Sequence, residues 1–248
     1  MIVLLTDFGL KDAYVAVMKA VILNIAPNEQ VIDLTHEIQS QNIAHANTIL
    51  IDNYHYFPKG TIFCCVIDPG VGTHRKSIIV KNKDYTYVGP DNGLFTNLIN
   101  SNSKIYLLNT PVHASNTFHG RDVYAPSSAS LTIKESFLNN LKQIPPSSCH
   151  IDNSLLLDDQ IKTQGSIIYS DHFGNLISNI RAKNLPKKFK IMVDNLEIPF
   201  VKTYDEICNQ QIAVLFSSSN RLEIAMKNSS ALTYFKKLKL ELIFDIAH

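Results

Sequence analysis

The fold is decided by the stretch IVLLTDFG at residues 2–9, in which four apolar residues lead into a polar loop. A short apolar run of this kind is typical of a buried strand, and the Thr-Asp-Phe-Gly that follows predicts a loop. Apolar residues then recur at helical spacing from Asp12 to Ile25, until Pro27 closes the segment. A buried strand, a loop and an amphipathic helix are the first unit of an α/β layer.

The following hundred residues repeat this alternation of strand and helix. The predicted elements are a strand over 31–34, an amphipathic helix over 43–57, a strand over 61–67, a hairpin over 77–80 and 85–88, a strand over 105–108 and a helix over 122–133. Strands separated by helices favour a mainly parallel sheet. We therefore predict an N-terminal α/β domain at residues 1–150.

The pattern of apolar residues changes after this domain. Between about residues 141 and 164 no periodicity is sustained, and the stretch contains Pro-Pro-Ser-Ser at 145–148, which favours a boundary between domains. Short apolar runs with little helix between them follow, at 166–169, 176–180, 190–193, 212–216, 222–225 and 238–244. They predict a smaller, antiparallel, barrel-like β domain at residues 160–248.

Composition and charge narrow the possible partners. Among 248 residues, 23 Lys and Arg stand against 22 Asp and Glu, so the net charge is +1. Without a global positive field, binding to nucleic acid or to a membrane surface is not expected. A hydrophobic fraction of 45% with a charged fraction of 18% indicates a packed globular protein rather than a disordered one.

The apolar runs and the cysteines indicate the compartment. No apolar run approaches the roughly 20 residues needed to cross a bilayer, and no basic leader precedes the first strand. Cys64, Cys65, Cys149 and Cys208 lack the paired spacing of a zinc site or a disulfide framework. We expect them to be buried apolar side chains in a reducing compartment, and hence a cytoplasmic protein.

Polar residues gather where the predicted strands end. Because ligands of α/β sheets bind beyond the carboxyl ends of the strands, the loops at 6–9, 68–75, 89–93 and 118–122 are candidate sites. Each loop has a structural alternative as a capped turn, a tight turn or a helix N-cap. Together they bring carboxylates, a histidine and two arginines to one edge of a sheet, which favours a functional site.

No phosphate-binding or metal-binding motif accompanies these loops. The Gly-Val-Gly at 70–72 lacks the third glycine of a dinucleotide loop, and no closely spaced histidine pair with carboxylates occurs. In the second domain, Phe173-Gly174-Asn175 supplies a flat apolar surface and an amide that suit adenine. Two plain β-turns, here and at 217–220, are the alternative.

Six ordered blocks resemble the S-adenosylmethionine (SAM) hydroxide adenosyltransferases, hydrolase relatives of the fluorinases and chlorinases. They lie at residues 6–9, 68–72, 89–93, 118–122, 173–175 and 220–225, so the resemblance spans nearly the whole chain. It implies an α/β domain joined to a smaller β domain, and a homotrimer whose active sites lie between subunits. It also implies that water attacks C5′ of SAM to give adenosine and methionine, with no cofactor and no metal.

The resemblance also implies roles for individual residues. Where halogenating relatives carry an aromatic hydroxyl and a Tyr-Ser pair, this chain has Asp68 and the pair His119-Gly120, which favours a hydrolase. The implied catalytic residues are Asp68, Arg75 and His119. The implied substrate-binding residues are Asp7 for the ribose hydroxyls, Asp12 and Asp171 for the methionine or ribose side, Asn175 for adenine, and Gly120, Ser218, Glu223, Met226 and Asn228 for the rest of the SAM site.

Two positions depart from the family pattern. Asn220 stands where many relatives have Gly, and asparagine tolerates a left-handed turn next best. His172 stands where a basic Arg or Lys is common. A halide-using relative and a non-catalytic adenosine-binding module remain alternatives, and the sequence leaves open which of Asp68, Arg75 and His119 holds the proton.

Overall fold

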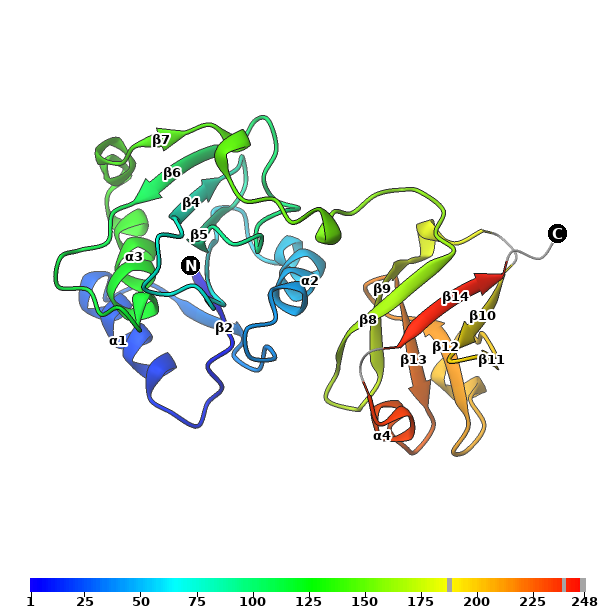
Figure 1. Ribbon diagram of the computed structural model, residues 1–248. Coiled ribbons are helices and arrows are strands. Elements are labelled where there is room, and N and C mark those ends of the chain that lie inside the picture. The colour runs from blue at the N-terminus through cyan, green and yellow to red at the C-terminus, as the bar shows by residue number, and fades with distance from the viewer. Residues whose placement is uncertain (187–188, 238–239, 246–248) are drawn as a thin grey trace. The chain divides into compact units, whose positions relative to one another are not determined.

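The computed structural model describes residues 1–186, 189–237 and 240–245, and divides the chain into two compact units, Met1–Leu156 and Leu157–His248 (Figure 1). The division falls in the segment where the sequence loses its periodicity. The first unit is an α/β domain and the second is an antiparallel β domain, so the predicted fold class is confirmed.

The first unit is built on one seven-stranded sheet. Its strands are, in spatial order, β2 (Val31–Thr35), β1 (Ile2–Thr6), β3 (Ile62–Val66), β5 (Thr86–Pro90), β4 (Ser77–Lys81), β6 (Lys104–Leu108) and β7 (Gln143–Ile144). The first four run parallel, and β4, β6 and β7 each pair antiparallel with the preceding strand. The hairpin of β4 and β5 therefore lies inside the sheet, because β5 pairs with β3.

Side chains of β1 alternate between two cores. Ile2 and Leu4 pack with helices α1 (Tyr14–Ile25) and α3 (Ala125–Ile133), whereas Val3 and Leu5 pack with α2 (Ile43–Asn53). Figure 1 shows α1 and α3 on one side of the sheet and α2 on the other. Burying each such side chain contributes about 1.5–3 kcal/mol. This explains why the strand is apolar at every position.

Two predicted helices have different ends in the structure. The predicted helix over 43–57 ends at Asn53, and a short 3₁₀ turn over Tyr54–Tyr56 continues toward Pro58. The predicted helix over 122–133 begins earlier, with a π-helical turn at Gly120–Tyr124 that runs into α3. Apolar spacing does not reveal a π turn, because the turn shifts the helical period by a single residue.

The second unit is a seven-stranded antiparallel sheet that closes on itself. Its strands are, in spatial order, β11 (Leu196–Ile198), β10 (Lys190–Val193), β14 (Glu241–Asp245), β8 (Gln164–Ser170), β9 (Leu176–Arg181), β13 (Arg221–Met226) and β12 (Ile212–Phe216). Val214 bridges the two edges, since its N–H donates to Pro199 O and its carbonyl accepts from Val201 N–H, each at 2.9 Å. The result is nearly a barrel, as predicted.

The sequence did not reveal β11 or the short helix α4 (Ala231–Phe235). A two-residue turn at Asp194 and Asn195, both with positive φ, joins β10 to β11, as in the hairpin turns that Asn and Asp favour. Of the strand predicted over 238–244, residues 238 and 239 lie outside the described residues.

The four cysteines are all free, but they differ in burial. Cys64 and Cys65 are buried on opposite faces of β3. Cys149 is half-buried and Cys208 is exposed, so the prediction that all four are core residues was wrong for these two. Within the described ranges, no helix combines the length and apolar character that a membrane span requires.

Candidate active site

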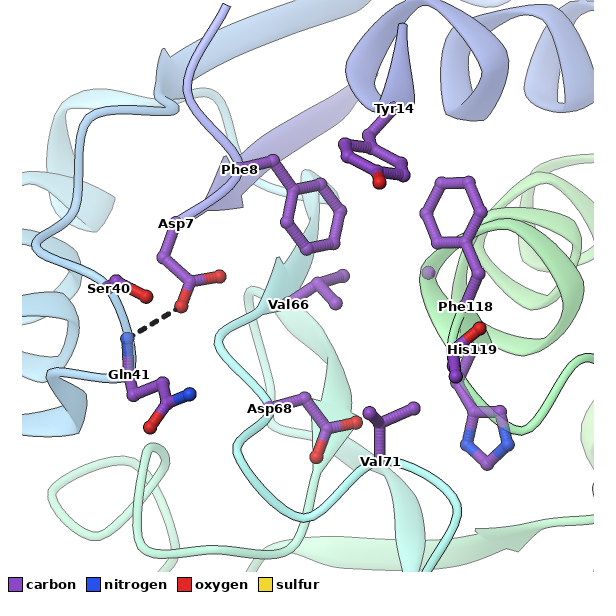
Figure 2. A pocket seen from close by; sticks show the side chains of 12 residues that line it. Asp7, Phe8, Tyr14, Ser40, Gln41, Val66, Asp68, Val71, Phe118 and His119 are labelled. Carbon is purple, nitrogen blue, oxygen red and sulfur yellow. Dashed lines mark hydrogen bonds between the residues drawn. The ribbon is translucent and has the colours of Figure 1, made fainter. Parts of the chain in front are cut away.

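A pocket of about 300 Å³ lies beyond the carboxyl ends of β1 and β3 (Figure 2). This volume is at the lower end of the roughly 300–1,000 Å³ of small-molecule sites. It is lined by Asp7, Phe8, Tyr14, Ser40, Gln41, Val66, Asp68, Val71, Thr117, Phe118, His119 and Gly120. Three of the four predicted loops therefore contribute to one cavity.

Sheet register brings two carboxylates to this pocket. Thr6 pairs with Val66, so β1 and β3 end at the same level, and Asp7 and Asp68 follow them. Asp7 accepts a hydrogen bond of 2.8 Å from the Gln41 N–H. Burial raises the pKa of Asp7, that hydrogen bond opposes the rise, and the charge of Asp68 adds to it.

Asp68, Arg75 and His119, the three residues that the resemblance marked as catalytic, form one hydrogen-bonded group. Arg75 Nε donates to Asp68 Oδ1 at 2.7 Å, and Nη2 donates both to Asp68 Oδ2 and, at 2.8 Å, to His119 Nδ1. The side chains of Asp68 and Arg75 are only 5% and 11% exposed. A fork-to-fork pair with so little water around it fixes the carboxylate plane.

Two further side chains complete the environment of Arg75. Ser77 Oγ accepts from Arg75 Nη1 at 2.7 Å, and it lies 3.1 Å from the hydroxyl of Tyr124. That hydroxyl also donates to Asp68 Oδ2 at 3.4 Å, and the guanidinium carbon is 5.7 Å from the centre of the Tyr124 ring. Each nitrogen of the Arg75 guanidinium is thus engaged, so the group is held rather than free to reach a ligand.

The bond from Arg75 assigns the tautomer of His119. A guanidinium can only donate, so His119 Nδ1 must accept, and the proton of the neutral ring sits on Nε2. Burial, together with the positive charge of Arg75, lowers the pKa of His119 below its ordinary value of 6.5. At neutral pH His119 is therefore an uncharged ring with a donor at Nε2.

Backbone geometry holds the segment that carries His119 against the rest of the first unit. The π-helical turn begins at Gly120, directly after His119, and carries Tyr124 at its far end. A Cβ at Gly120 would lie 3.1 Å from Met18 Sδ and 3.2 Å from the Phe118 ring, so the turn packs closely on α1. Gly120 lines the pocket, and a side chain there would crowd Met18 and Phe118.

The 89–93 loop does not reach the pocket. Asp91 accepts from His150 N–H at 2.8 Å and lies 3.8 Å from Lys76 Nζ, while Asn92 donates to Ile67 O at 2.8 Å. These contacts connect the loop after β5 to the end of β3 and to the segment around His150, near the end of the first unit. Asp122 in the 118–122 loop does not act as a helix N-cap, because it lies inside the helical turn Gly120–Tyr124 and its carboxylate accepts hydrogen bonds from Arg121 and from the Ser115 N–H.

Asp12 is exposed in the loop before α1 and does not line the pocket. Its predicted role in substrate binding stays a prediction.

In the second unit, Asp171 organises the turn at Phe173-Gly174-Asn175. Its Oδ1 accepts from the N–H groups of Phe173 and Asn175, and its Oδ2 accepts from Asn175 Nδ2 at 3.0 Å. Buried Glu223 accepts from the Tyr204 hydroxyl. Burial raises the pKa of Glu223, and nearby Asp171 adds to the rise.

The remaining candidates of the second unit are spread along one hairpin. Ser218 and Asn228 are exposed at its two ends. Met226 packs with the larger core of this unit, whereas the strand alternation places Glu223 on the opposite face of β13. Glu223 and Met226 therefore do not share one surface of the strand.

Sequence reasoning missed several residues of the first-unit site. Ser77 and Tyr124 hold Arg75, and Tyr14 and Gln41 line the pocket. Tyr124 was counted as part of a helix, and Ser77 as the start of a strand. The available signal was a polar group on an otherwise buried element, which is costly unless it has a partner.

Both parts of the chain match one family. Residues 2–140 match the SAM hydroxide adenosyltransferase N-terminal domain, and residues 165–240 match the C-terminal domain of the same name. The chain belongs to the SAM hydroxide adenosyltransferase family. The resemblance drawn from the six sequence blocks is thereby confirmed.

Named relatives match almost the entire chain. A Methanocaldococcus jannaschii protein named (R)-S-adenosyl-L-methionine hydrolase is 36% identical over 98% of this chain and 95% of its own length. A Thermus thermophilus protein of that name is 33% identical over 92% of each chain. A relative from Nocardia brasiliensis named fluorinase is 24% identical over 96% of this chain and 93% of its own length.

Solved structures share the fold. An uncharacterized conserved protein from Thermotoga maritima matches with a TM-score of 0.87 at 30% identity, over 99% of this chain and 100% of its own. A conserved hypothetical protein from Thermus thermophilus matches with a TM-score of 0.80 at 30% identity, over 98% and 99% of the two chains.

Proposed function

We propose that this protein hydrolyses the (R) epimer of SAM to adenosine and L-methionine, by attack of water at C5′. One observation supports this proposal above all. Asp68, Arg75 and His119 form a hydrogen-bonded, largely buried group at the wall of a pocket, in a member of this family. The hydrolase relatives, at 33–36% identity, support this reaction over halide transfer.

The charge change in this reaction suits a weakly polar site. In the displacement, a hydroxide-like nucleophile bonds to C5′ while the bond from C5′ to the positive sulfur breaks and the sulfur leaves as a neutral thioether, so charge disappears as the transition state forms. The difficult part is the nucleophile, because bulk water has a pKa of about 15.7. A base held in place contributes about 10²–10⁴-fold, and positioning contributes more.

The hydrogen bonds divide this work between two residues. The Nε2–H of His119 can only donate, so it orients the attacking water and stabilises hydroxide character. The water proton then goes to Asp68, whose carboxylate has lone pairs beyond those that bind Arg75. Arg75, which is bonded to both residues, keeps the two groups at a fixed spacing.

The remaining substrate contacts follow from the family. In this proposal Asp7 binds the ribose hydroxyls, Asn175 binds adenine, and Asp12 and Asp171 face the methionine or ribose side. The rest of the SAM site is lined by Gly120, Ser218, Glu223, Met226 and Asn228. The protein works as a homotrimer with active sites between subunits, without a metal or cofactor, in the cytoplasm, where four free thiols stay reduced.

The decisive experiment supplies purified protein with (R)-SAM in ¹⁸O-labelled water and identifies the products by mass spectrometry. We expect methionine and adenosine labelled at the 5′ hydroxyl. Unlabelled adenosine, or binding of adenosine without release of methionine, would contradict the proposal. Formation of 5′-chloro-5′-deoxyadenosine in chloride would instead indicate halide transfer.

A further inference from the structure

Three aromatic rings form one wall of the pocket. Phe8 follows β1, Tyr14 begins α1, and Phe118 precedes the π-helical turn, so the rings come from three separate segments. Their centroids are 5.7 Å (Phe8 to Tyr14), 5.8 Å (Phe8 to Phe118) and 5.2 Å (Tyr14 to Phe118) apart. The planes are inclined by 55–83°, so the rings make a corner rather than a stack.

The three rings of this corner are not fully buried in the hydrophobic core. Phe8 and Phe118 pack on the core from outside, and Tyr14 is 48% exposed. All three rings nevertheless line the cavity, as Figure 2 shows. Apolar surface that is left open inside a pocket is surface that a ligand can cover.

The electrostatics of this wall favour a cation. The carboxylates of Asp7 and Asp68 line the same pocket. The Arg121 guanidinium already lies 5.3 Å from the centre of the Phe118 ring, and Asp122 neutralises it through two hydrogen bonds. Aromatic faces attract cations through the ring quadrupole, and corners of several rings are used to recognise quaternary ammonium groups.

We propose that Phe8, Tyr14 and Phe118 form a cage for the sulfonium group of the substrate, and that Tyr14 discriminates the sulfonium from a neutral thioether. This proposal rests on the function proposed above. A sulfonium resembles a quaternary ammonium, because its charge is spread over the attached carbons and it has no N–H to hydrogen-bond. Aromatic rings can replace the water around such a group with a small free-energy cost of desolvation.

The choice of rings over a carboxylate has a chemical reason. The sulfonium charge is lost in the transition state, so a close carboxylate would stabilise the ground state more and raise the barrier. The weaker attraction of the rings binds the cation with less of this penalty. Figure 2 also shows the rings at one end of the pocket and Asp68 and His119 at the other. That separation suits an in-line displacement, in which nucleophile and leaving sulfur lie on opposite sides of C5′.

The test compares the affinities for SAM and for its neutral thioether analogue, S-adenosylhomocysteine. Both are measured by calorimetry in an Asp68→Asn background, in which SAM is consumed at least about tenfold more slowly. Replacing Tyr14 or Phe118 by Leu is expected to weaken binding of the sulfonium about three- to tenfold, while binding of the thioether changes less than about twofold. Tyr14→Phe, which keeps the ring, should retain the preference.

Matched variants keep the result interpretable. Tyr56 is 73% exposed and does not line the pocket, so Tyr56→Leu should leave both affinities unchanged. Equal losses for the two ligands, or none, in the Tyr14→Leu and Phe118→Leu proteins would overturn the cage. Because binding is measured apart from turnover, a wild-type protein that binds the sulfonium selectively without hydrolysing it would contradict the proposed function and not the cage.

Discussion

Arg75 lies at the centre of the hydrogen-bonded group, and each nitrogen of its guanidinium binds another side chain. Its guanidinium binds Asp68, His119 and Ser77. Removing one partner of such a desolvated ion pair typically costs about 3–5 kcal/mol. Conservative substitutions are therefore needed to separate catalysis from stability.

We predict that Asp68→Asn and His119→Ala each lower turnover by at least about tenfold and leave adenosine binding largely intact, because base and donor act on the water. Steady-state kinetics and adenosine calorimetry check this. Asp91→Asn is the matched control, since the side chain of Asp91 is also 5% exposed but holds His150 and Lys76 outside the pocket. Loss of adenosine binding with unchanged turnover would reverse the assignment.

The tautomer of His119 predicts a pH dependence. Protonation of Nδ1 would break its bond to Arg75, and the pKa of His119 is lowered by burial and by Arg75. The midpoint of the decline in turnover at acid pH should therefore lie below 6.5, the ordinary pKa of histidine. Glutamine in the His119→Gln variant offers an acceptor and a donor but does not titrate. The residual turnover of this variant should therefore show no decline at acid pH. An unchanged decline in that variant would assign the titration to another group.

At the scale of elements, the loop from Asp68 to Arg75 depends on one glycine. Gly72 has φ of +77°, and a Cβ there would lie 2.4 Å from the carbonyl oxygen of Asn116, in the segment that leads to His119. The loop and that segment can approach each other only because Gly72 has no side chain.

We predict that Gly72→Ala lowers both thermal stability and turnover, because backbone strain of about 1–3 kcal/mol falls on the spacing between Arg75 and His119. Differential scanning fluorimetry and kinetics measure the two effects. Gly60 also has a positive φ, +88°, but nothing lies within 4 Å of its added Cβ. Gly60→Ala should therefore cost stability alone, and equal losses of turnover in both variants would show that the contact with Asn116 is unimportant.

The elements themselves were largely predictable, and their exceptions have physical causes. Continuous apolar runs marked β1 and β3, because both faces of these strands are buried. The π-helical turn at Gly120–Tyr124 was hidden, since apolar spacing is insensitive to one extra residue in a turn. Strand β11 was missed because three residues carry too little pattern.

At the scale of the whole molecule, the proposed trimer makes a quantitative prediction. If each site joins the first unit of one subunit to the second unit of a neighbour, Asp68→Asn and Asn175→Ala lie in opposite halves of a site. Asn175→Ala alone should weaken adenosine binding. At a SAM concentration too low for the Asn175→Ala chain to bind it, co-expression of the two chains should give roughly a quarter of the wild-type activity, because random assortment in a closed ring leaves that share of sites intact.

Two measurements check the trimer. Light scattering should give three times the chain mass of 27.8 kDa. Co-expression of Asp68→Asn with His119→Ala, which are both in the first unit, should restore nothing. Equal recovery in the two mixtures, or none in either, would contradict sites shared between subunits.

The sequence by itself determined the family and the order of most of the elements, and its resemblance to that family implied Asp68, Arg75 and His119 as catalytic residues. These follow from local composition and from ordered motifs, and they do not depend on distances. Only the tertiary structure decided that Arg75 is saturated, that His119 donates through Nε2, and that Phe8, Tyr14 and Phe118 meet in one corner. Such contacts join residues far apart in the chain, and they depend on strand register, loop packing and side-chain rotamers, none of which a local pattern specifies.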